Sequence, residues 1–433
     1  MFQTIKNAWK LADLRKKILF SLFILLLYRI GAQIPVPFLT ADLAASMNAQ
    51  TSGSILQYLN ILSGGAFSNA TLFALGISPY ITASIVIQLL TVAIPPLERL
   101  AKEGEDGKKK LNQITRYTTV ALALLTAVGY YMMLRNYNYL TDKGVFAAVV
   151  IIACYCAGSS LVMWLAEKIN ESGIGNGISL ILFVNIVSRG PAILNALVAY
   201  ASGSNDSVPH WAGILITIGS VILGLFMIVL IVFINDSERR IPIQYAKKVV
   251  GRKMYGGQNS TLPIKLNNTG VMPIIFASSI VSIPATIGLF VDYSKSKFWS
   301  GFFKFFDTGS WAYAVITLIL IIAFAYFYIL ISFNPVEVSN NLKKNGGSIP
   351  GIRPGKPTSD YITRVLNRIT LIGAIFLAFI AVFPMVLNIF TGNAMSGLTF
   401  GGSSIIIVVG VVLETAREIE GQLTMRHYKG FLE

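Results

Sequence analysis

The sequence predicts an all-α polytopic membrane protein with ten transmembrane helices. The 433 residues are 54% hydrophobic and only 13% charged, whereas about a quarter of the residues in soluble domains are charged. Long apolar stretches recur along the chain, and the segments between them alternate between strongly basic and almost free of Lys and Arg. The net charge of +15, which in a soluble protein would first suggest nucleic acid, is therefore read as a property of one set of loops.

Ten stretches approach the roughly 20 mostly apolar residues that a helix needs to cross the hydrocarbon layer. They cover residues 18–34, 71–93, 117–134, 145–166, 177–200, 212–234, 271–291, 312–333, 369–390 and 404–420. The first follows a basic segment, as in a signal peptide, but no convincing cleavage site and many further spans follow, so we interpret it as a retained helix. The fifth is the least regular, because Asn185, Arg189, Gly190 and Pro191 interrupt it.

The Lys and Arg residues predict the orientation. With the N-terminus inside, 28 of the 35 Lys and Arg residues belong to inner segments and 5 to outer ones. The remaining two, Arg29 and Arg189, lie in the outer halves of their spans, and we interpret them as interfacial anchors that reach outward. Cytoplasmic loops carry an excess of cations, so both termini are predicted to be cytoplasmic.

The spans divide into an N-terminal half, 1–200, and a C-terminal half, 201–433. Two related units with five spans each must lie in opposite orientations, the inverted-repeat arrangement of many transport folds. This expectation rests on span counting alone.

The composition argues against coupled transport and catalysis. No Asp or Glu lies near the middle of a span, while Glu167, Asp236 and Glu414 lie near cytoplasmic ends; coupled transporters usually place ionisable groups at bilayer depth. The chain has no nucleotide-binding or zinc-protease motif, and with two Cys and two His a disulfide framework or metal site is not expected. We predict a passive pore without catalytic residues, metal or cofactor, powered by a partner.

The segment before the second span has an unusual composition. Residues 55–62 are apolar but too few to span, and residues 63–71 are small and uncharged. A half-helix folded back into a cavity would satisfy both features. The alternative is an interfacial helix lying on the outer surface.

Two cytoplasmic loops, 235–270 and 334–368, are long and basic. Residues 241–245 could form a strand, and Pro350, Pro354 and Pro357 with neighbouring glycines predict a stiff protruding tip around Arg353. A preorganised cationic tip suits docking of a partner rich in phosphate or carboxylate. Retention of positive charge on the inner side explains most single Lys residues equally well.

At these residues the chain closely resembles the SecY family, the channel subunits of the bacterial protein-conducting translocon. The resemblance rests on motifs spread in order along nearly the whole chain: Ser63–Ala66, Phe73–Ser84, Gly173–Ser179, Arg239–Ile241, Pro273–Ser279, Phe333–Pro335, Pro350–Gly355 and Phe400–Gly402.

The resemblance implies a central hourglass pore between two inverted five-helix halves, closed by a ring of aliphatic side chains and a short plug half-helix at about 55–71. By motif position the ring consists of Ile77, Ile81, Leu182, Ile186, Ile275 and Ile407, with Leu182 in place of the commoner Ile. The plug residues are Leu59, Leu62, Gly64, Gly65 and Phe67. The lateral gate residues are Thr82, Gln88, Ser278, Ser279 and Ile283. In the family, this gate is the seam between the second and third spans on one side and the seventh and eighth on the other. The polar gate residues could hydrogen-bond across the seam or to carbonyls of their own helices.

The resemblance also implies partners. Docking residues for the SecA motor ATPase and the translating ribosome would be Arg239, Arg240, Lys247, Lys248, Arg252, Arg353 and Lys356. The family works with the small membrane subunits SecE and SecG, receives signal peptides, and translocates or laterally inserts polypeptides at the bacterial cytoplasmic membrane. The alternatives are a small-solute secondary transporter, which ten spans would fit but the interior without carboxylates would not, and a membrane enzyme, for which no acid/base or metal constellation is present.

Overall fold

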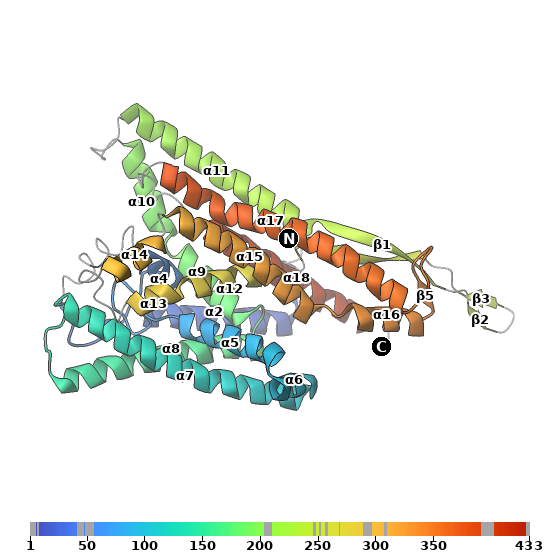
Figure 1. Ribbon diagram of the computed structural model, residues 1–433, viewed down its shortest axis with the longest axis horizontal. Helices are drawn as coiled ribbons and strands as arrows, with labels where there is room; N and C mark the ends of the chain where they lie inside the picture. Colours follow the sequence, from blue (N-terminus) through green and yellow to red (C-terminus); the bar gives the residue numbers. More distant parts are fainter. Residues whose placement is uncertain are drawn as a thin grey trace.

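Long helices running roughly along one axis make up most of the molecule (Figure 1). The structure, a computed structural model, describes residues 6, 8–40, 47, 56–202, 210–245, 248–250, 253–255, 259–267, 269–288, 297–306, 310–390 and 402–429. The helices are α2 (Ala12–Gly31), α4 (Leu56–Leu62), α5 (Ser78–Ala93), α6 (Pro95–Lys102), α7 (Glu105–Asn136), α8 (Val145–Ser172), α9 (Gly177–Val187), α10 (Gly190–Ala201), α11 (His210–Asp236), α12 (Met272–Val281), α13 (Ile283–Gly288), α14 (Lys297–Phe305), α15 (Trp311–Ser332), α16 (Pro335–Lys344), α17 (Lys356–Phe390) and α18 (Gly402–Lys429).

Each predicted span coincides with one of these helices or with a broken pair. Among the described residues, six helices are long and apolar enough to cross a membrane, or seven if α5 and α6, bent by 102°, are counted as one span. Helices α2 and α18 include clusters of charged residues and α12–α13 is short, so the number of ten spans stays a prediction. The all-α polytopic class is confirmed.

Prolines, glycines and capping side chains account for several helix boundaries. The fifth predicted span is broken into α9 and α10, with Pro191 in the first turn of the second helix, where a missing N–H is tolerated. Helix α9 is capped by Asn176, the residue before its start, whose side chain accepts hydrogen bonds from the N–H groups of Ile178 and Ser179. Helix α5 begins at Ser78 rather than at residue 71, because residues 71–77 form turns.

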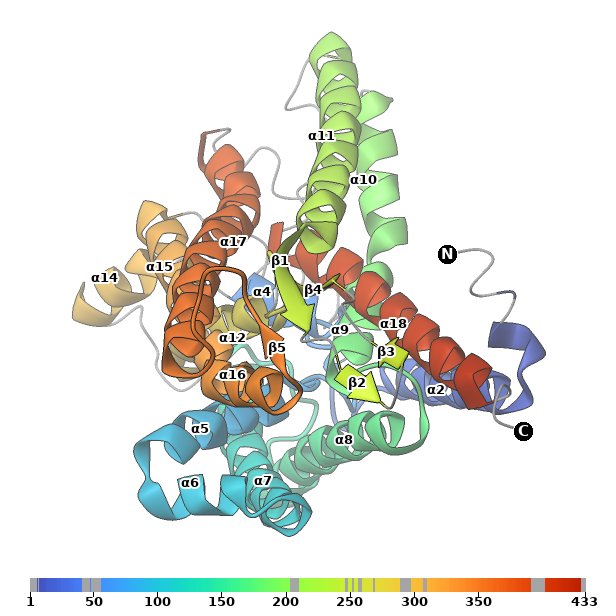
Figure 2. The ribbon, with the colours of Figure 1, turned by 90° about the vertical axis from the view of Figure 1, so that its right-hand side faces the viewer.

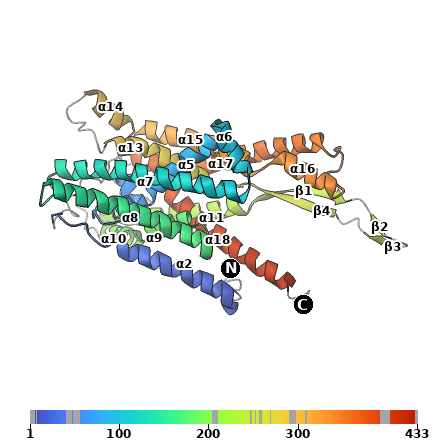
Figure 3. The same cartoon turned by 90° about the horizontal axis from the view of Figure 1, so that it is seen from below.

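A small sheet extends from one end of the helices (Figures 1 and 3). Strand β1 (Glu238–Tyr245) lies between β4 (Asn259–Lys265) and β5 (Gly347–Ser348), antiparallel to both. The pairs Arg240–Pro263 and Gln244–Ser348 give the register. Strands β2 (Lys248–Val250) and β3 (Lys253–Tyr255) form a separate hairpin. The strand predicted at 241–245 is confirmed.

The main apolar core joins the two predicted halves. It contains residues of α2, α5, α8 and α9 from the first half and of α11, α12, α15, α17 and α18 from the second. Viewed from the end that carries the sheet, the short helix α4 lies near the centre, surrounded by longer helices (Figure 2).

Candidate pore, plug and docking end

The six residues predicted for the ring belong to one buried apolar cluster. Ile77 directly precedes α5 and Ile81 lies in its first turn; Leu182 and Ile186 come from α9, Ile275 from α12 and Ile407 from α18. None is more than 4% exposed. In the described chain, side chains from both predicted halves therefore pack in one buried apolar cluster. Branched aliphatic groups that line a constriction exclude water and still yield to a passing chain.

The segment predicted as the plug is folded into the protein. Asn60 is 4% exposed, Leu62 6% and Phe67 2%, so the segment does not lie on the outer surface as an interfacial helix would. Leu62 packs in the same cluster as the ring, while Leu59 and Phe67 pack against a second cluster that includes Tyr130. Gly64 and Gly65 form the turn after α4.

Side chains from three helices hydrogen-bond to the backbone of the plug segment and of the turns that follow it. Asn185 Nδ2 of α9 donates to the Leu62 carbonyl at 2.7 Å, and the Tyr130 hydroxyl of α7 donates to the Phe67 carbonyl at 2.5 Å. From α8, Tyr155 and Ser159 donate to carbonyls of residues 70 and 76 at 3.3 and 3.4 Å. Sequence reasoning did not assign these donors to the site; only Asn185 had stood out, as a polar residue in an apolar span.

The residues predicted for the lateral gate lie on α5, α12 and the start of α13. Thr82 Oγ1 donates to the Ser78 carbonyl at 3.1 Å and Ser279 Oγ to the Ile275 carbonyl at 2.8 Å. Both hydroxyls are thus bonded within their own helices rather than across the seam. Ser278 is buried and lies in α12, Ile283 is exposed, and Gln88 is half-buried on α5.

A cavity of about 250 Å³ lies between this seam and the plug. It touches Leu59 and Phe67 of the plug segment, Thr82 of α5 and Ile283 of α13. Most of its lining is apolar, so it suits hydrocarbon rather than a charged solute.

Arg29 and Arg189, which the sequence predicts to be interfacial anchors, are partly enclosed by the protein. Both side chains are half-buried, and the Nη1 atom of each is enclosed without a hydrogen-bond partner among the described residues. Arg189 lies in the break between α9 and α10, directly before the first residue of α10.

The described docking residues lie on β1 and β2, in the loop that precedes α17 and at the first residue of α17, at the end of the molecule that carries the sheet (Figures 1 and 3). Arg239 and Arg240 on β1, and Arg353 and Lys356 at the proline-rich tip, are exposed. Lys248 lies on β2, while Lys247 and Arg252 lie outside the described residues.

The proline-rich tip is braced. Ser339 Oγ of α16 donates to the Gly355 carbonyl at 2.7 Å, and Thr358 Oγ1 donates to the Arg353 carbonyl at 2.9 Å. Ile349 is buried in a cluster with Ile241 of β1. Side-chain hydrogen bonds and apolar contacts therefore stabilise the tip in addition to its prolines. The packing of Ile349 and Ile241 in one cluster joins the described parts of the two basic loops.

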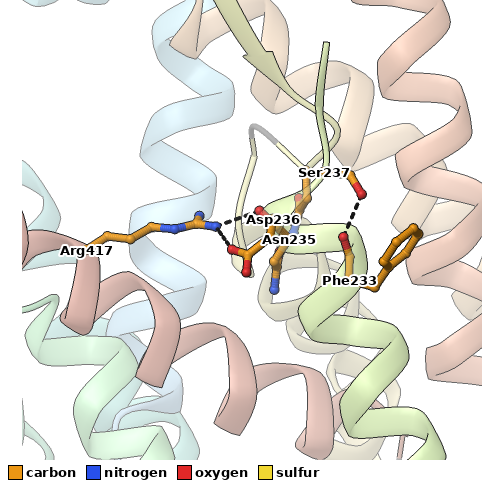
Figure 4. Close-up of polar contacts among 6 residues, drawn as sticks. Phe233, Asn235, Asp236, Ser237 and Arg417 are labelled. Carbon is orange, nitrogen blue, oxygen red and sulfur yellow. Dashed lines mark hydrogen bonds and ion pairs between the residues drawn. The ribbon is translucent and has the colours of Figure 1, made fainter. Parts of the chain in front are cut away.

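Where the sheet meets the helices, Arg417 of α18 binds the end of α11 (Figure 4). Its Nη2 atom lies 2.6 Å from Asp236 Oδ1 and donates to the Asn235 carbonyl at 2.7 Å. A polar cavity of about 360 Å³, lined in part by Asn235, Asn267 and Lys265, opens beside it. Burial, together with the Arg417 charge, lowers the pKa of Lys265. This ion pair, between residues far apart in sequence, was not predicted.

A buried aliphatic cluster shared by two groups of helices, a short helix packed against it and a basic end define a multi-pass membrane protein with the architecture of a channel. The chain belongs to the SecY family, whose model matches residues 71–416.

Curated relatives match over their whole length. The protein translocase subunit SecY of Streptomyces coelicolor is 44% identical over 449 residues, and that of Mycobacterium tuberculosis is 42% identical over 452 residues; each alignment covers all of both chains. A solved protein-conducting channel covers 94% of this chain and 91% of its own, with a TM-score of 0.60 and 18% identity. Sec61 in the canine ribosome–channel complex has the same coverage and identity, with a TM-score of 0.61. At such identity these structures show the shared fold.

Proposed function

We propose that this chain is a passive protein-conducting channel that moves unfolded polypeptides across a membrane and releases apolar segments sideways into it. The observation that carries the proposal is the buried cluster in which Ile77, Ile81, Leu182, Ile186, Ile275 and Ile407 from both halves meet. A polypeptide would pass between the halves, where these side chains close around it and limit the leak of water and ions. The plug segment would close the pore from the outer side.

Sideways release would occur between α5 and α12–α13. Thr82 and Ser279 already bond to carbonyls of their own helices, so parting this seam would leave their hydroxyls satisfied. Lipid tails are as apolar as the side chains they would replace. A membrane segment could therefore leave through the seam at low free-energy cost.

The driving force would come from partners at the basic end. Arg239, Arg240, Arg353 and Lys356 are exposed there and could pair with ribosomal phosphates or with carboxylates of a motor ATPase such as SecA. Solved relatives of this fold include the Ssh1 complex bound to a ribosome. The small subunits SecE and SecG would complete the assembly.

The proposed location is the bacterial cytoplasmic membrane, with both termini in the cytoplasm. The beginning of α2, the α6–α7 connection, the sheet and the end of α18 lie toward one end of the molecule (Figure 3), and these segments carry most of the Lys and Arg residues. This arrangement supports an inner, cation-rich face.

Crosslinking of a stalled secretory chain tests the proposal. After Cys154 and Cys156 are replaced by Ser, single Cys residues are placed at positions 77, 81 and 275, and at Val229, which is 68% exposed on α11, as the control. We expect the stalled chain to crosslink at the three ring positions and not at 229. Crosslinks at 229 without any at the ring would exclude passage between the halves.

A further inference from the structure

Asn185 is a polar residue in an apolar helix that also contributes two residues to the ring. It precedes the ring residue Ile186, and its side chain is 0% exposed. A buried amide in a membrane helix is unfavourable unless it is hydrogen-bonded. Its Nδ2 atom donates to the Leu62 carbonyl of the plug at 2.7 Å, while its Oδ1 atom accepts no hydrogen bond from the described residues.

Asn185 lies close to the plug backbone at two positions, Leu62 and Gly64. The Leu62 carbonyl lies at the end of α4, and no backbone N–H of the described residues outside that helix bonds to it. Next in the turn, Gly64 has φ +66°, and a Cβ atom built there would lie 2.9 Å from Asn185 Oδ1 and 3.0 Å from its Cα. The backbone of the plug therefore rests directly on Asn185.

The other three donors hold the segment further along the chain. Tyr130, Tyr155 and Ser159 bond to carbonyls of residues 67–76 from α7 and α8. Of the four, only Asn185 belongs to a helix that also contributes to the ring. A movement of α9 that widens the ring would act on this hydrogen bond.

We infer that Asn185 is a positioning residue for the closed pore: its amide holds the plug helix over the ring and sets how readily the pore opens. The inference rests on the proposed channel function. A neutral amide suits this task, because a plug that has moved away leaves the amide N–H group to bond to water, and for that group the net difference is that of one hydrogen bond. A charged pair would be much harder to separate.

The test measures potassium leak from loaded vesicles that contain the full chain with its membrane partners. Asn185→Leu keeps the volume and removes the donor, leaving the Leu62 carbonyl unpaired when the plug is closed. We expect the resting leak to rise at least about fivefold. The control is Ser188→Ala at the C-terminal end of the same helix, whose hydroxyl donates to the Asn185 backbone carbonyl rather than to the plug, and its leak should equal that of the wild type.

Two neighbouring glycines give a second test that leaves Asn185 in place. Gly64 and Gly65 both have positive φ, but a Cβ at Gly65, with φ +89°, meets nothing within 4 Å. Both Ala variants are strained in the turn, and only Gly64→Ala also presses on Asn185. We expect Gly64→Ala to leak more than Gly65→Ala.

Two results would overturn the inference: an Asn185→Leu leak within twofold of the wild type, or equal leaks from the two glycine variants. Translocation of a signal-bearing protein into the same vesicles is measured in parallel. If the wild type translocates and the leak does not respond, only the role of Asn185 fails. If the wild type does not translocate, the proposed function itself fails.

Discussion

Tyr130 permits a quantitative prediction about what holds the plug segment. The residue is 0% exposed, its hydroxyl donates to the Phe67 carbonyl at 2.5 Å, and its ring centroid lies 4.7 Å from that of Phe67 and 5.0 Å from that of Tyr155. Tyr130→Phe removes the hydroxyl and leaves the ring contacts. Tyr130→Ala removes both.

The two substitutions should differ clearly in their effect on the free energy of unfolding. The Phe67 carbonyl also accepts from the N–H of Ala70 at 3.2 Å, so Tyr130→Phe does not leave it without a partner. The loss should therefore be that of one ordinary hydrogen bond, about 1 kcal/mol. Tyr130→Ala also opens a cavity between two aromatic rings, and about 3–5 kcal/mol should be lost.

Unfolding of the purified protein in mixed micelles, followed by tryptophan fluorescence, measures both losses. Tyr117→Phe is the control, because Tyr117 lies on the same helix and is 77% exposed; its effect should stay within about 0.5 kcal/mol. If Tyr130→Ala were no more destabilising than Tyr117→Phe, the segment would not depend on this contact, and the assignment of Tyr130 as an anchor would be wrong.

Three further predictions concern the ring, the docking end and a close helix contact. The double variant Ile81→Gly, Ile275→Gly should leak ions in a planar bilayer, because two side chains buried in the shared cluster are removed; a conductance equal to the wild type would rule out the aliphatic seal. Arg353→Glu should block motor-driven export while the channel itself still inserts, and unchanged secretion of a reporter would refute the docking role. Gly158→Ala should lower the free energy of unfolding by about 1–3 kcal/mol, because its Cβ would lie 2.0 Å from a backbone carbonyl oxygen of the segment after the plug.

Matched variants separate these effects from general damage. Gly224→Ala makes the same change in a membrane helix where a Cβ meets nothing within 4 Å, so it should not destabilise the protein. Arg135→Glu reverses an exposed charge at the predicted outer end of α7 and should leave export intact. If either control behaves like its partner variant, the corresponding local explanation is wrong.

The helices could be predicted from sequence because apolar length and charge placement are local properties of the chain. The same reasoning placed the start of the second span at residue 71, and here it was wrong. Residues 71–77 are apolar enough for a helix, but they form turns with Gly76 at φ +55°, and the Thr71 amide bonds back to the Ala66 carbonyl. Contacts with the plug override local propensity.

The donors that hold the plug could not be predicted for a different reason. Tyr130, Tyr155 and Asn185 bond to backbone carbonyls 63, 85 and 123 residues away. Because every residue has a backbone carbonyl, the residue type does not reveal which one accepts the bond. Arg417 and Asp236 do have complementary charges, but they are 181 residues apart, and the many other cations of the inner loops hide the pairing. The ring and gate residues came from family motifs, not from periodicity.

The cavity beside the plug suggests how sideways opening and pore opening would be linked. Leu59 and Phe67 of the plug segment line it together with Thr82 and Ile283 of the proposed gate. An apolar segment entering this space would replace contacts of the gate and of the plug at the same time, so its binding free energy would favour parting of the seam and release of the plug together. A hydrophilic segment would gain little from the same space. Under the proposed function, packing of an apolar segment in this cavity would therefore couple the two openings.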